Sequence, residues 1–409
     1  MGIYSDLGRN PGVFRVLVSQ LSARFPFGML SIILLIHMQT RYGDYTSAGI
    51  VLAAGSVGQA IGGPLTSRLM GFWGARRLLA ITSLACGVLI ALMAFAPLQL
   101  LAMSVVSFVM GLATPPVSSA VRTIYPKLVP GNQLSALFSL DAAAQEIIWV
   151  VGPVVAVFVS AQFGTAIGLC VAAAFMLGGG LWFISSPAMR DIRIPKSKGS
   201  LGEVLRLPTV LISTAVGFFF VGNFAALEAG IVRAFIPDDA ANAHASVEAG
   251  IVLSVYSIGS LVGGLLFGHR DARPWSLALR IGAVLVGTAA CLVSLNIVWL
   301  SIVLFIGGMG TAPAFAAISS IVSSTVRFSE TAEAFGWINT GQLVGVAAGS
   351  AFAGFAIDLM GAHGAILVSV GFLIVALLVS LSAMRWLPDL RGASLAQPPE
   401  TGDVAIPLP

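Results

Sequence analysis

The chain has 409 residues, of which 57% are hydrophobic and only 9% are charged. A soluble domain averages about 25% charged residues, so this composition excludes an ordinary water-soluble protein and predicts a chain embedded in lipid. The formal net charge of +4 comes from basic residues that lie between apolar stretches rather than on one face, which argues against a nucleic-acid partner.

Twelve apolar stretches are each long enough to cross a bilayer as a helix, which takes about 20 residues. They are expected near residues 13–38, 47–70, 77–96, 98–122, 134–159, 164–185, 209–235, 247–268, 275–296, 298–324, 332–358 and 364–387. The longest polar connector follows the sixth stretch and carries five basic residues. We therefore expect an all-α polytopic membrane protein with four parts: an N-terminal six-helix bundle (1–185), a basic cytoplasmic connector (186–208), a C-terminal six-helix bundle (209–387) and a disordered cytoplasmic tail (388–409).

The two halves resemble each other in sequence. The segment SVGQAIGGPL, from Ser56 to Leu65, recurs about half a chain later as SIGSLVGGLL, from Ser257 to Leu266. Helices 5 and 11 align through three pairs of residues: Phe138 with Phe335, Gln145 with Gln342, and Gly152 with Gly349. Because each half has an even number of helices, the repeats are parallel and related by an axis along the membrane normal. Transporters built from such halves place the substrate site at their interface.

Lysine and arginine residues predict the orientation, because they favour the cytoplasmic side. With the N-terminus inside, the basic residues fall at or near cytoplasmic helix ends except Arg24, Arg41 and Arg233. Both termini are therefore expected in the cytoplasm. The very short loops and the absence of an Asn-x-Ser/Thr sequon favour a bacterial plasma membrane.

This arrangement of helices, with its basic connector and a Gly-rich turn between helices 2 and 3, resembles the major facilitator superfamily over residues 10–388. The family's signature in that turn is Gly-x-Leu-Ala-Asp-Arg, a short spacer and Gly-Arg-Arg. The matching residues are Gly63, Leu65, Arg68, Gly74, Arg76 and Arg77. The second half keeps Gly264, Leu266 and Arg270. In the family the acidic residue of the signature helps to latch the cytoplasmic side, and here its position holds Ser67, with a longer spacer behind it.

The resemblance implies a secondary active transporter for a small molecule that works by alternating access. Gly152 and Pro153 in helix 5 resemble the first part of the antiporter signature of the family's exporters, whose later glycines are absent here. We therefore favour a proton-coupled exporter of a small, moderately hydrophobic compound. The close alternative is uptake of a small metabolite by a symporter or facilitator, with Arg24 binding an anionic group. A membrane enzyme is a distant alternative, because no cluster of His, Asp or Glu is found at a membrane face.

Two charges lie at the depth of the bilayer midplane. Arg24 is about eleven residues into helix 1, or roughly 16 Å, and Glu146 lies at a similar depth in helix 5. Helices 1 and 5 are neighbours in the family that the chain resembles. A charge buried in lipid costs at least about 3 kcal/mol and normally has a partner. We expect Arg24 and Glu146 to interact, directly or through water or substrate, as a proton- or substrate-responsive pair; a static ion pair is the alternative.

Two further acids carry open alternatives. Asp141 shares a helix face with Gln145 and lies nearer the cytoplasm, where it could meet Arg122 at the end of helix 4 as an inner gate or as a structural pair. Glu228 lies in the outer half of helix 7, five residues before Arg233. It is either a second proton site, an outer gate, or the partner of Arg233 at the helix end.

Polar and aromatic residues at intermediate depth are candidates for the substrate cavity. They are Phe27, Gln59, Gln145, Asn223, Asn339 and Gln342. Each polar member could hydrogen-bond a ligand or hold two helices together. We expect a monomer whose partners are a small-molecule substrate, protons and the lipid bilayer, with no nucleic acid, cofactor or metal.

Overall fold

The computed structural model describes residues 2–191, 194–196, 199–235, 247–268 and 273–388. Within these ranges all regular structure is helical, and eleven helical spans are long and apolar enough to cross a membrane. The ninth predicted span, residues 275–296, is represented by the shorter α13 (Ser276–Ala290). It ends early because the chain turns at Cys291, and α14 begins at Ile297, where the Asn296 side chain accepts the amide of Val298 at 2.9 Å.

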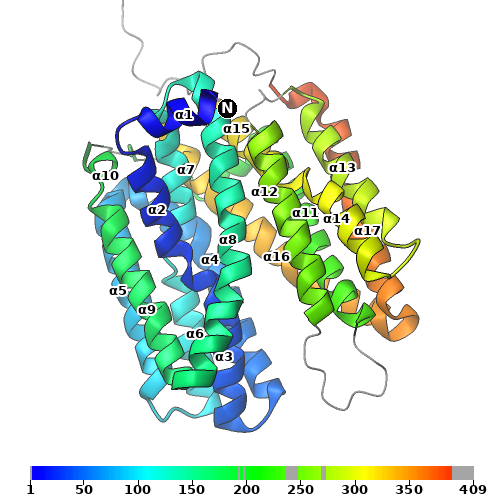
Figure 1. The fold of residues 1–409 in the computed structure, drawn as a ribbon. Coiled ribbons are helices and arrows are strands. Elements are labelled where there is room, and N and C mark those ends of the chain that lie inside the picture. Colours follow the sequence, from blue (N-terminus) through cyan, green and yellow to red (C-terminus); the bar gives the residue numbers. More distant parts are fainter. Residues whose placement is uncertain (1, 192–193, 197–198, 236–246, 269–272, 389–409) are drawn as a thin grey trace, which may run out of the picture.

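The helices form two bundles that lie side by side (Figure 1). The first bundle contains α2 (Val13–Arg24), α3 (Pro26–Tyr42), α4 (Tyr45–Trp73), α5 (Ala75–Phe95), α6 (Leu100–Leu112), α7 (Val117–Leu128), α8 (Gly131–Phe163) and α9 (Thr165–Ile184). The second contains α11 (Pro208–Ala234), α12 (Val247–Phe267), α13, α14 (Ile297–Gly308), α15 (Thr311–Thr325), α16 (Phe328–Met360) and α17 (Ala362–Ser382). Four short helices lie outside the spans: α1 (Gly2–Arg9), α10 (Pro187–Asp191), η1 (Glu203–Arg206) and η2 (Met384–Trp386).

Three spans are interrupted near their middle. The first is divided at Phe25 between α2 and α3, the fourth at residues 113–116 between α6 and α7, and the tenth at residues 309–310 between α14 and α15. Pro115 and Pro116 cause the second of these interruptions, because proline has no amide to donate to the preceding turn. Non-helical backbone at membrane depth is tolerated where it is buried in protein or lines a cavity.

Glycines at repeated positions set the helix packing in both bundles. An added Cβ on Gly58 of α4 would overlap a backbone oxygen of α6, and one on Gly259 of α12 would overlap a backbone oxygen of α14. Gly152 packs in the same way on Gly28 of α3, and Gly349 packs on α11. Small residues allow this close approach of helices in lipid. The sequence repeat is therefore also a repeat of packing.

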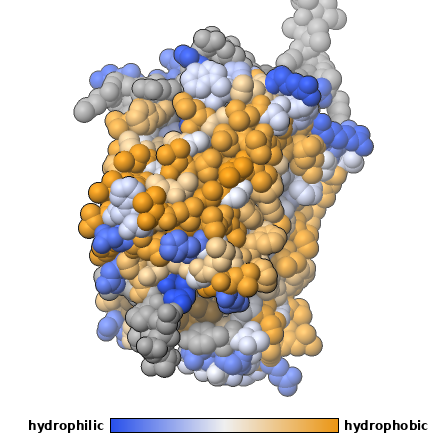
Figure 2. Space-filling model, turned by 90° about the vertical axis from the view of Figure 1, so that its right-hand side faces the viewer, coloured by the Kyte–Doolittle hydropathy of each residue, from blue (hydrophilic) through white to orange (hydrophobic). Residues whose placement is uncertain are grey.

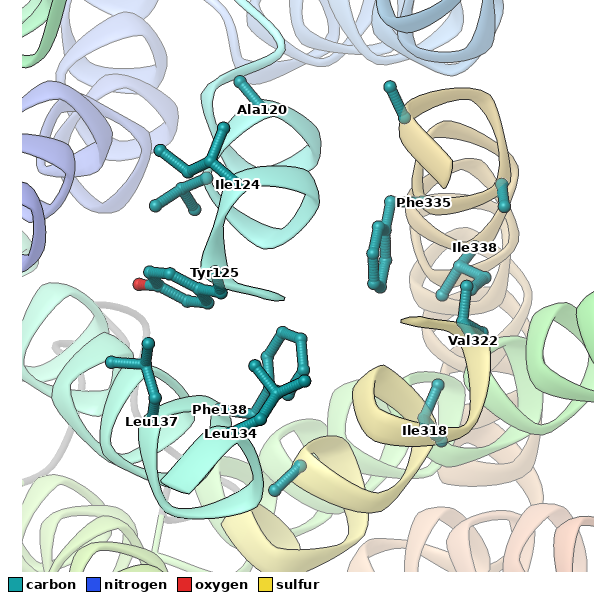
Figure 3. Close-up of a cluster of buried hydrophobic side chains, with 14 of the residues drawn as sticks. Ala120, Ile124, Tyr125, Leu134, Leu137, Phe138, Ile318, Val322, Phe335 and Ile338 are labelled. Atoms are coloured by element: carbon teal, nitrogen blue, oxygen red, sulfur yellow. The ribbon is translucent and has the colours of Figure 1, made fainter. Parts of the chain in front are cut away.

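Among the described residues, the buried core shared by both bundles lies toward one end of the molecule. We call the end that carries α1, Arg68 and Lys127 the basic end, and the opposite end the far end. At the basic end one buried cluster includes both bundles, and Figure 3 shows Tyr125 and Phe138 across from Phe335. Toward the far end one buried cluster lies entirely within residues 29–176 and another within residues 227–366. The ribbons accordingly diverge toward the far end (Figure 1).

The outer surface suits a lipid environment. Large hydrophobic side chains are exposed on most spans, for example Leu101 with 78% and Val293 with 75% of their surface accessible. Figure 2 shows that hydrophobic residues dominate the middle of one face, while hydrophilic residues gather at its top and bottom edges. Such a distribution is expected of a protein whose middle lies in hydrocarbon.

Candidate functional site

A cavity of about 180 Å³ lies between the bundles, toward the basic end. Several residues predicted to face a substrate line it: Arg24, Phe27, Gln59, Gln145 and Asn339. Gly63 of the signature segment lines it as well. The interrupted fourth span contributes Pro115 and Pro116, and Trp149 supplies an aromatic wall. The cavity thus combines apolar surface with a small number of polar groups, as small-molecule sites do.

Arg24 is buried at the edge of this cavity and is held by three side chains. Its Nη1 lies 3.2 Å from Oδ1 of Asp141 and donates to Oε1 of Gln20 at 2.8 Å. Its Nη2 donates to Oε1 of Gln145. Only 3% of the Arg24 side chain and 1% of the Asp141 side chain are accessible. Arg24 therefore has a carboxylate partner, which is Asp141 and not Glu146, the acid at the same depth.

Arg24 and Glu146 were expected to interact directly or through water or substrate, and the structure shows no direct contact between them. Asp141 and Gln145 are four residues apart and share the face of α8 that meets α2, whereas Glu146 lies about 100° further around the helix. Glu146 instead accepts a hydrogen bond from Oγ of Ser260 on α12 at 2.9 Å. Within the described residues no ion pair involves Glu146. The carboxyl group of Glu146 therefore connects the two bundles.

Asp141 is the centre of a buried polar cluster. Besides Arg24, it accepts hydrogen bonds from Nε2 of Gln20 at 2.8 Å and from the Tyr125 hydroxyl at 3.2 Å. Nε of Arg122 lies 3.7 Å from its Oδ2, so the predicted contact with Arg122 is confirmed. Two arginines share one aspartate, which leaves an excess positive charge beside the cavity. The Arg122 guanidinium also lies 5.8 Å from the ring of Phe335 in the second bundle.

An ion pair at the basic end joins the bundles and the connector. Nη1 of Arg68 lies 3.1 Å from Oε2 of Glu333 on α16, and Arg68 also donates to the Gly199 carbonyl. The other Glu333 oxygen accepts the Gly202 amide at 2.7 Å. Ser67 replaces the acid of the signature, yet a charge-based contact forms here with an acid from the other bundle. Sequence reasoning missed Glu333, because a charge at the start of a span is ordinary.

Close backbone contacts support the closed basic end at two symmetric places. Between α4 and α16, the Thr340 hydroxyl donates to the Ala60 carbonyl at 2.7 Å, and an added Cβ on Gly336 would lie 2.9 Å from Cα of Pro64. Between α8 and α12, the Ser139 hydroxyl donates to the Gly264 carbonyl at 2.7 Å. Gly63 and Gly264 of the repeated segment therefore lie at equivalent positions of the interface.

Two residues with an expected role in the cavity have other neighbours. Asn223 is buried between α11 and α17, where its amide donates to the Phe220 carbonyl of its own helix and its oxygen accepts the Ser369 hydroxyl at 3.2 Å. The bond from Ser369 joins two helices, which fits the second of the two roles expected for Asn223 and not ligand binding. Gln342 packs beside Gly217 of α11 and is not among the residues that line the cavity described above, so its contact with a substrate stays a prediction.

The remaining predicted residues have defined positions. Glu228 is exposed on α11, and Arg233 lies near the end of the same helix. Arg76 and Arg77 are exposed in the first turn of α5, and Pro153 lies within α8 beside Gly152. Arg270 lies outside the described residues, as does almost all of the predicted tail. No group of three or more His, Cys, Asp or Glu able to hold a metal occurs in the described part of the chain.

Comparison with known proteins identifies the family. The model of the Major Facilitator Superfamily matches residues 16–227 and matches again over residues 218–408. The chain belongs to the major facilitator superfamily. The double match corresponds to the two halves of the sequence repeat, and membership supports a role in transport across a membrane.

Relatives share the fold at low sequence identity. An uncharacterized MFS-type transporter, y4rN, of Sinorhizobium fredii (strain NBRC 101917 / NGR234) is 24% identical over 282 residues, which cover 65% of this chain and 68% of that protein. The crystal structure of the human organic anion transporter MFSD10 (TETRAN) has a TM-score of 0.67 at 16% identity, covering 90% of this chain and 98% of that one. The proton:xylose symporter XylE, bound to 6-bromo-6-deoxy-D-glucose, gives 0.70 at 12% identity, covering 94% and 98%. A bacterial homologue of the iron transporter ferroportin, in an outward-facing state, gives 0.70 at 13% identity, covering 91% and 98%.

Proposed function

We propose that this protein is a proton-coupled secondary transporter that exports a small, moderately hydrophobic compound by alternating access. The observation that carries the proposal is the hydrogen bond from Ser260 to Glu146, since it places between the two bundles a carboxyl group that has no ion pair with any described residue. A proton binding there changes a contact that must break when the bundles rock. An intramembrane ionisable residue is a functional candidate by default.

The packing supports an outward-facing assignment. The basic residues favour the cytoplasmic side for the basic end, so we place both termini in the cytoplasm of a bacterial plasma membrane. The basic end is closed by the ion pair of Arg68 with Glu333 and by the contact of Ser139 with Gly264. Opening toward the cytoplasm requires these contacts to separate together with the bond from Ser260 to Glu146.

A proton at Glu146 favours that opening. A hydrogen bond to a charged group contributes about 1.5–3 kcal/mol, and a neutral bond about 0.5–1.5 kcal/mol. Neutralising Glu146 therefore weakens the contact with Ser260 by about 1 kcal/mol, or roughly fivefold in the equilibrium. In this scheme a proton enters from the far end and leaves at the basic end, and the substrate travels in the opposite direction while Glu146 is ionised.

The other charges have supporting roles in the proposal. Asp141, with Arg24 and Arg122, forms an inner gate next to the cavity, whose wall the substrate contacts through Phe27, Gln59 and Gln145. Glu228, exposed on α11, is a second proton-accessible group nearer the far end. Gly152 and Pro153 favour export through the part of the exporter signature that they match. The functional unit is a monomer.

The test is proton flux in proteoliposomes on addition of a panel of candidate compounds. Wild type should show a compound-dependent flux that Glu146→Gln loses while the variant still folds and binds the compound. Glu203→Gln is the matched control, because Glu203 is exposed on the connector and, in the described part of the chain, accepts hydrogen bonds from Ser200 alone. Uptake of a compound that ignores the proton gradient in wild type would refute coupling.

A second candidate, uptake of an anionic metabolite with a proton, is favoured by the excess positive charge beside the cavity. With Glu146 protonated, Arg24, Arg122 and Asp141 carry a net positive charge that an anionic group on the substrate would balance. Loading a proton and an anion together fits symport. The flux assay separates the two candidates, because an exporter and a symporter move protons in opposite directions relative to the compound.

A further inference from the structure

A second concave site lies on the outer face of the second bundle, away from the central cavity. It is a groove of about 810 Å³ between α13, α14 and α17, on the side of the molecule that faces the viewer in Figure 2. Apolar side chains such as Val286, Ile306 and Leu381 line it. Its size is within the range of about 300–1,000 Å³ that holds small ligands in proteins.

The groove exists because α13 carries small residues. Gly287 packs on α14 so closely that an added Cβ would lie 2.5 Å from Cα of Gly307. Gly282, in contrast, has nothing within 4 Å of an added Cβ, so its side of α13 opens into the groove. With 15 residues, α13 is about 22 Å long, shorter than the roughly 30 Å of hydrocarbon in a bilayer. Apolar surface of this part of the bundle therefore faces outward, where acyl chains of the bilayer can reach it.

Two arginines lie at the basic-end mouth of the groove, each held by a tryptophan. Trp275 and Met384 line the mouth. The guanidinium of Arg273 lies 5.5 Å from the centre of the Trp275 ring, and that of Arg385 lies 3.9 Å from the centre of the Trp386 ring. Both arginines are exposed. Tryptophan is typical of the level of lipid headgroups, and a cation over its ring is attracted to the ring face.

We propose that this groove binds an anionic glycerophospholipid from the leaflet at the basic end. One acyl chain lies along α13 between α14 and α17, and the phosphate is held by Arg273 and Arg385. The combination of an apolar groove with two cations at one mouth is complementary to a lipid with a negative headgroup. The site does not depend on the direction or coupling of transport.

Native mass spectrometry of the detergent-solubilised full-length protein tests the proposal. Phosphatidylglycerol and phosphatidylcholine with identical acyl chains are added at equal concentration. Wild type should retain phosphatidylglycerol preferentially, by about fivefold for each arginine near the surface. Exchanging both arginines, R273Q with R385Q, should remove the preference while phosphatidylcholine binding stays.

Gly282→Leu should reduce retention of both lipids, because an added Cβ there has nothing within 4 Å and the rest of the side chain occupies part of the groove. Gly178→Leu on α9 is the control, since Gly178 is exposed and also has nothing within 4 Å of an added Cβ. Equal retention of the two lipids by wild type would overturn the proposal. So would a preference that survives the arginine exchange, or a dimer that disappears in Gly282→Leu, which would assign the groove to a second copy of the chain.

Discussion

Glu333→Gln should open the basic end of the transporter. The substitution keeps the size of the side chain and an oxygen that can accept the Gly202 amide, but removes the charge that faces Arg68. Only 14% of the Arg68 side chain and 2% of the Glu333 side chain are accessible, so water screens this pair much less than a surface pair. The contact between Arg68 and Glu333 joins the two bundles and must break when the basic end opens.

The size of the effect follows from the geometry. A hydrogen bond between charged groups at 3.1 Å contributes about 1.5–3 kcal/mol. Removing it changes the equilibrium between the two states by roughly 10- to 150-fold, at 1.4 kcal/mol for each factor of ten. Because the side-chain amide of the variant would keep one hydrogen bond to the connector, we expect a value near the lower end. Arg68→Gln should have a similar effect, and the double variant should add little.

Double electron–electron resonance reports the equilibrium directly. Spin labels at Gln99 and Val293, on the far-end loops after α5 and α13, are introduced after replacement of the three native cysteines. Wild type should show mainly the long distance of a separated far end, and Glu333→Gln should add a shorter distance. Glu203→Gln should match wild type, since Glu203 bonds only within the connector among the described residues. Identical distributions for Glu333→Gln and wild type would refute the role of this pair as a latch.

Five further substitutions, used in three experiments, test the structural account. Asp141→Asn removes the carboxylate shared by two buried arginines and should lower the free energy of unfolding by about 3–5 kcal/mol; an unchanged thermal transition in detergent would contradict it. Gly152→Val should reduce the yield of monodisperse protein on size exclusion, because an added Cβ would lie 2.8 Å from the backbone of α3. Gly178→Val should not reduce the yield, because an added Cβ at Gly178 has nothing within 4 Å. Equal yields for the two variants would argue against tight packing at Gly152. Asn223→Ala should lower thermal stability and leave the KM of a transported compound unchanged, whereas Asn339→Ala should raise KM; the reverse pattern would restore Asn223 to the cavity.

Sequence reasoning was most successful where one-dimensional properties decide the structure. The apolar stretches and the repeated glycines predict the spans and the two-bundle fold. The end of α13 was missed, because residues 291–296 are mostly apolar although the chain leaves the helix. The amides of Cys291 and Leu292 bond three residues back, to Thr288 and Ala289, at 3.1 Å. Hydropathy does not distinguish such a turn from a continuing helix.

The partners of buried charges were harder to predict than their depth. The position of Arg24 along its helix could be counted, but the choice between Asp141 and Glu146 depends on which side of α8 faces α2. The spacing of Asp141 and Gln145 did contain that information, because residues four apart share a face. Gln20, four residues before Arg24, could have been found by the same rule.

Contacts between the bundles depend on the conformational state as well as on the sequence. Glu333 meets Arg68 across the two bundles with the basic end closed, so neither residue's local pattern identifies the other. Ser260 is an ordinary small residue of a glycine-rich helix until α12 lies against α8. Asn223 was placed in the cavity because its depth is suitable, whereas its direction within the bundle decides its role.

The central claim is that a proton at Glu146 moves the transporter from one state to the other. The most direct measurement is the distance between labels at Gln99 and Val293 as a function of pH, in wild type and in Glu146→Gln. In wild type, lowering the pH should increase the short-distance population, because protonation weakens the bond from Ser260 that holds the basic end closed. Glu146→Gln should show the low-pH distribution at every pH. The same pH dependence in both proteins would contradict the account and leave Glu146 a structural role.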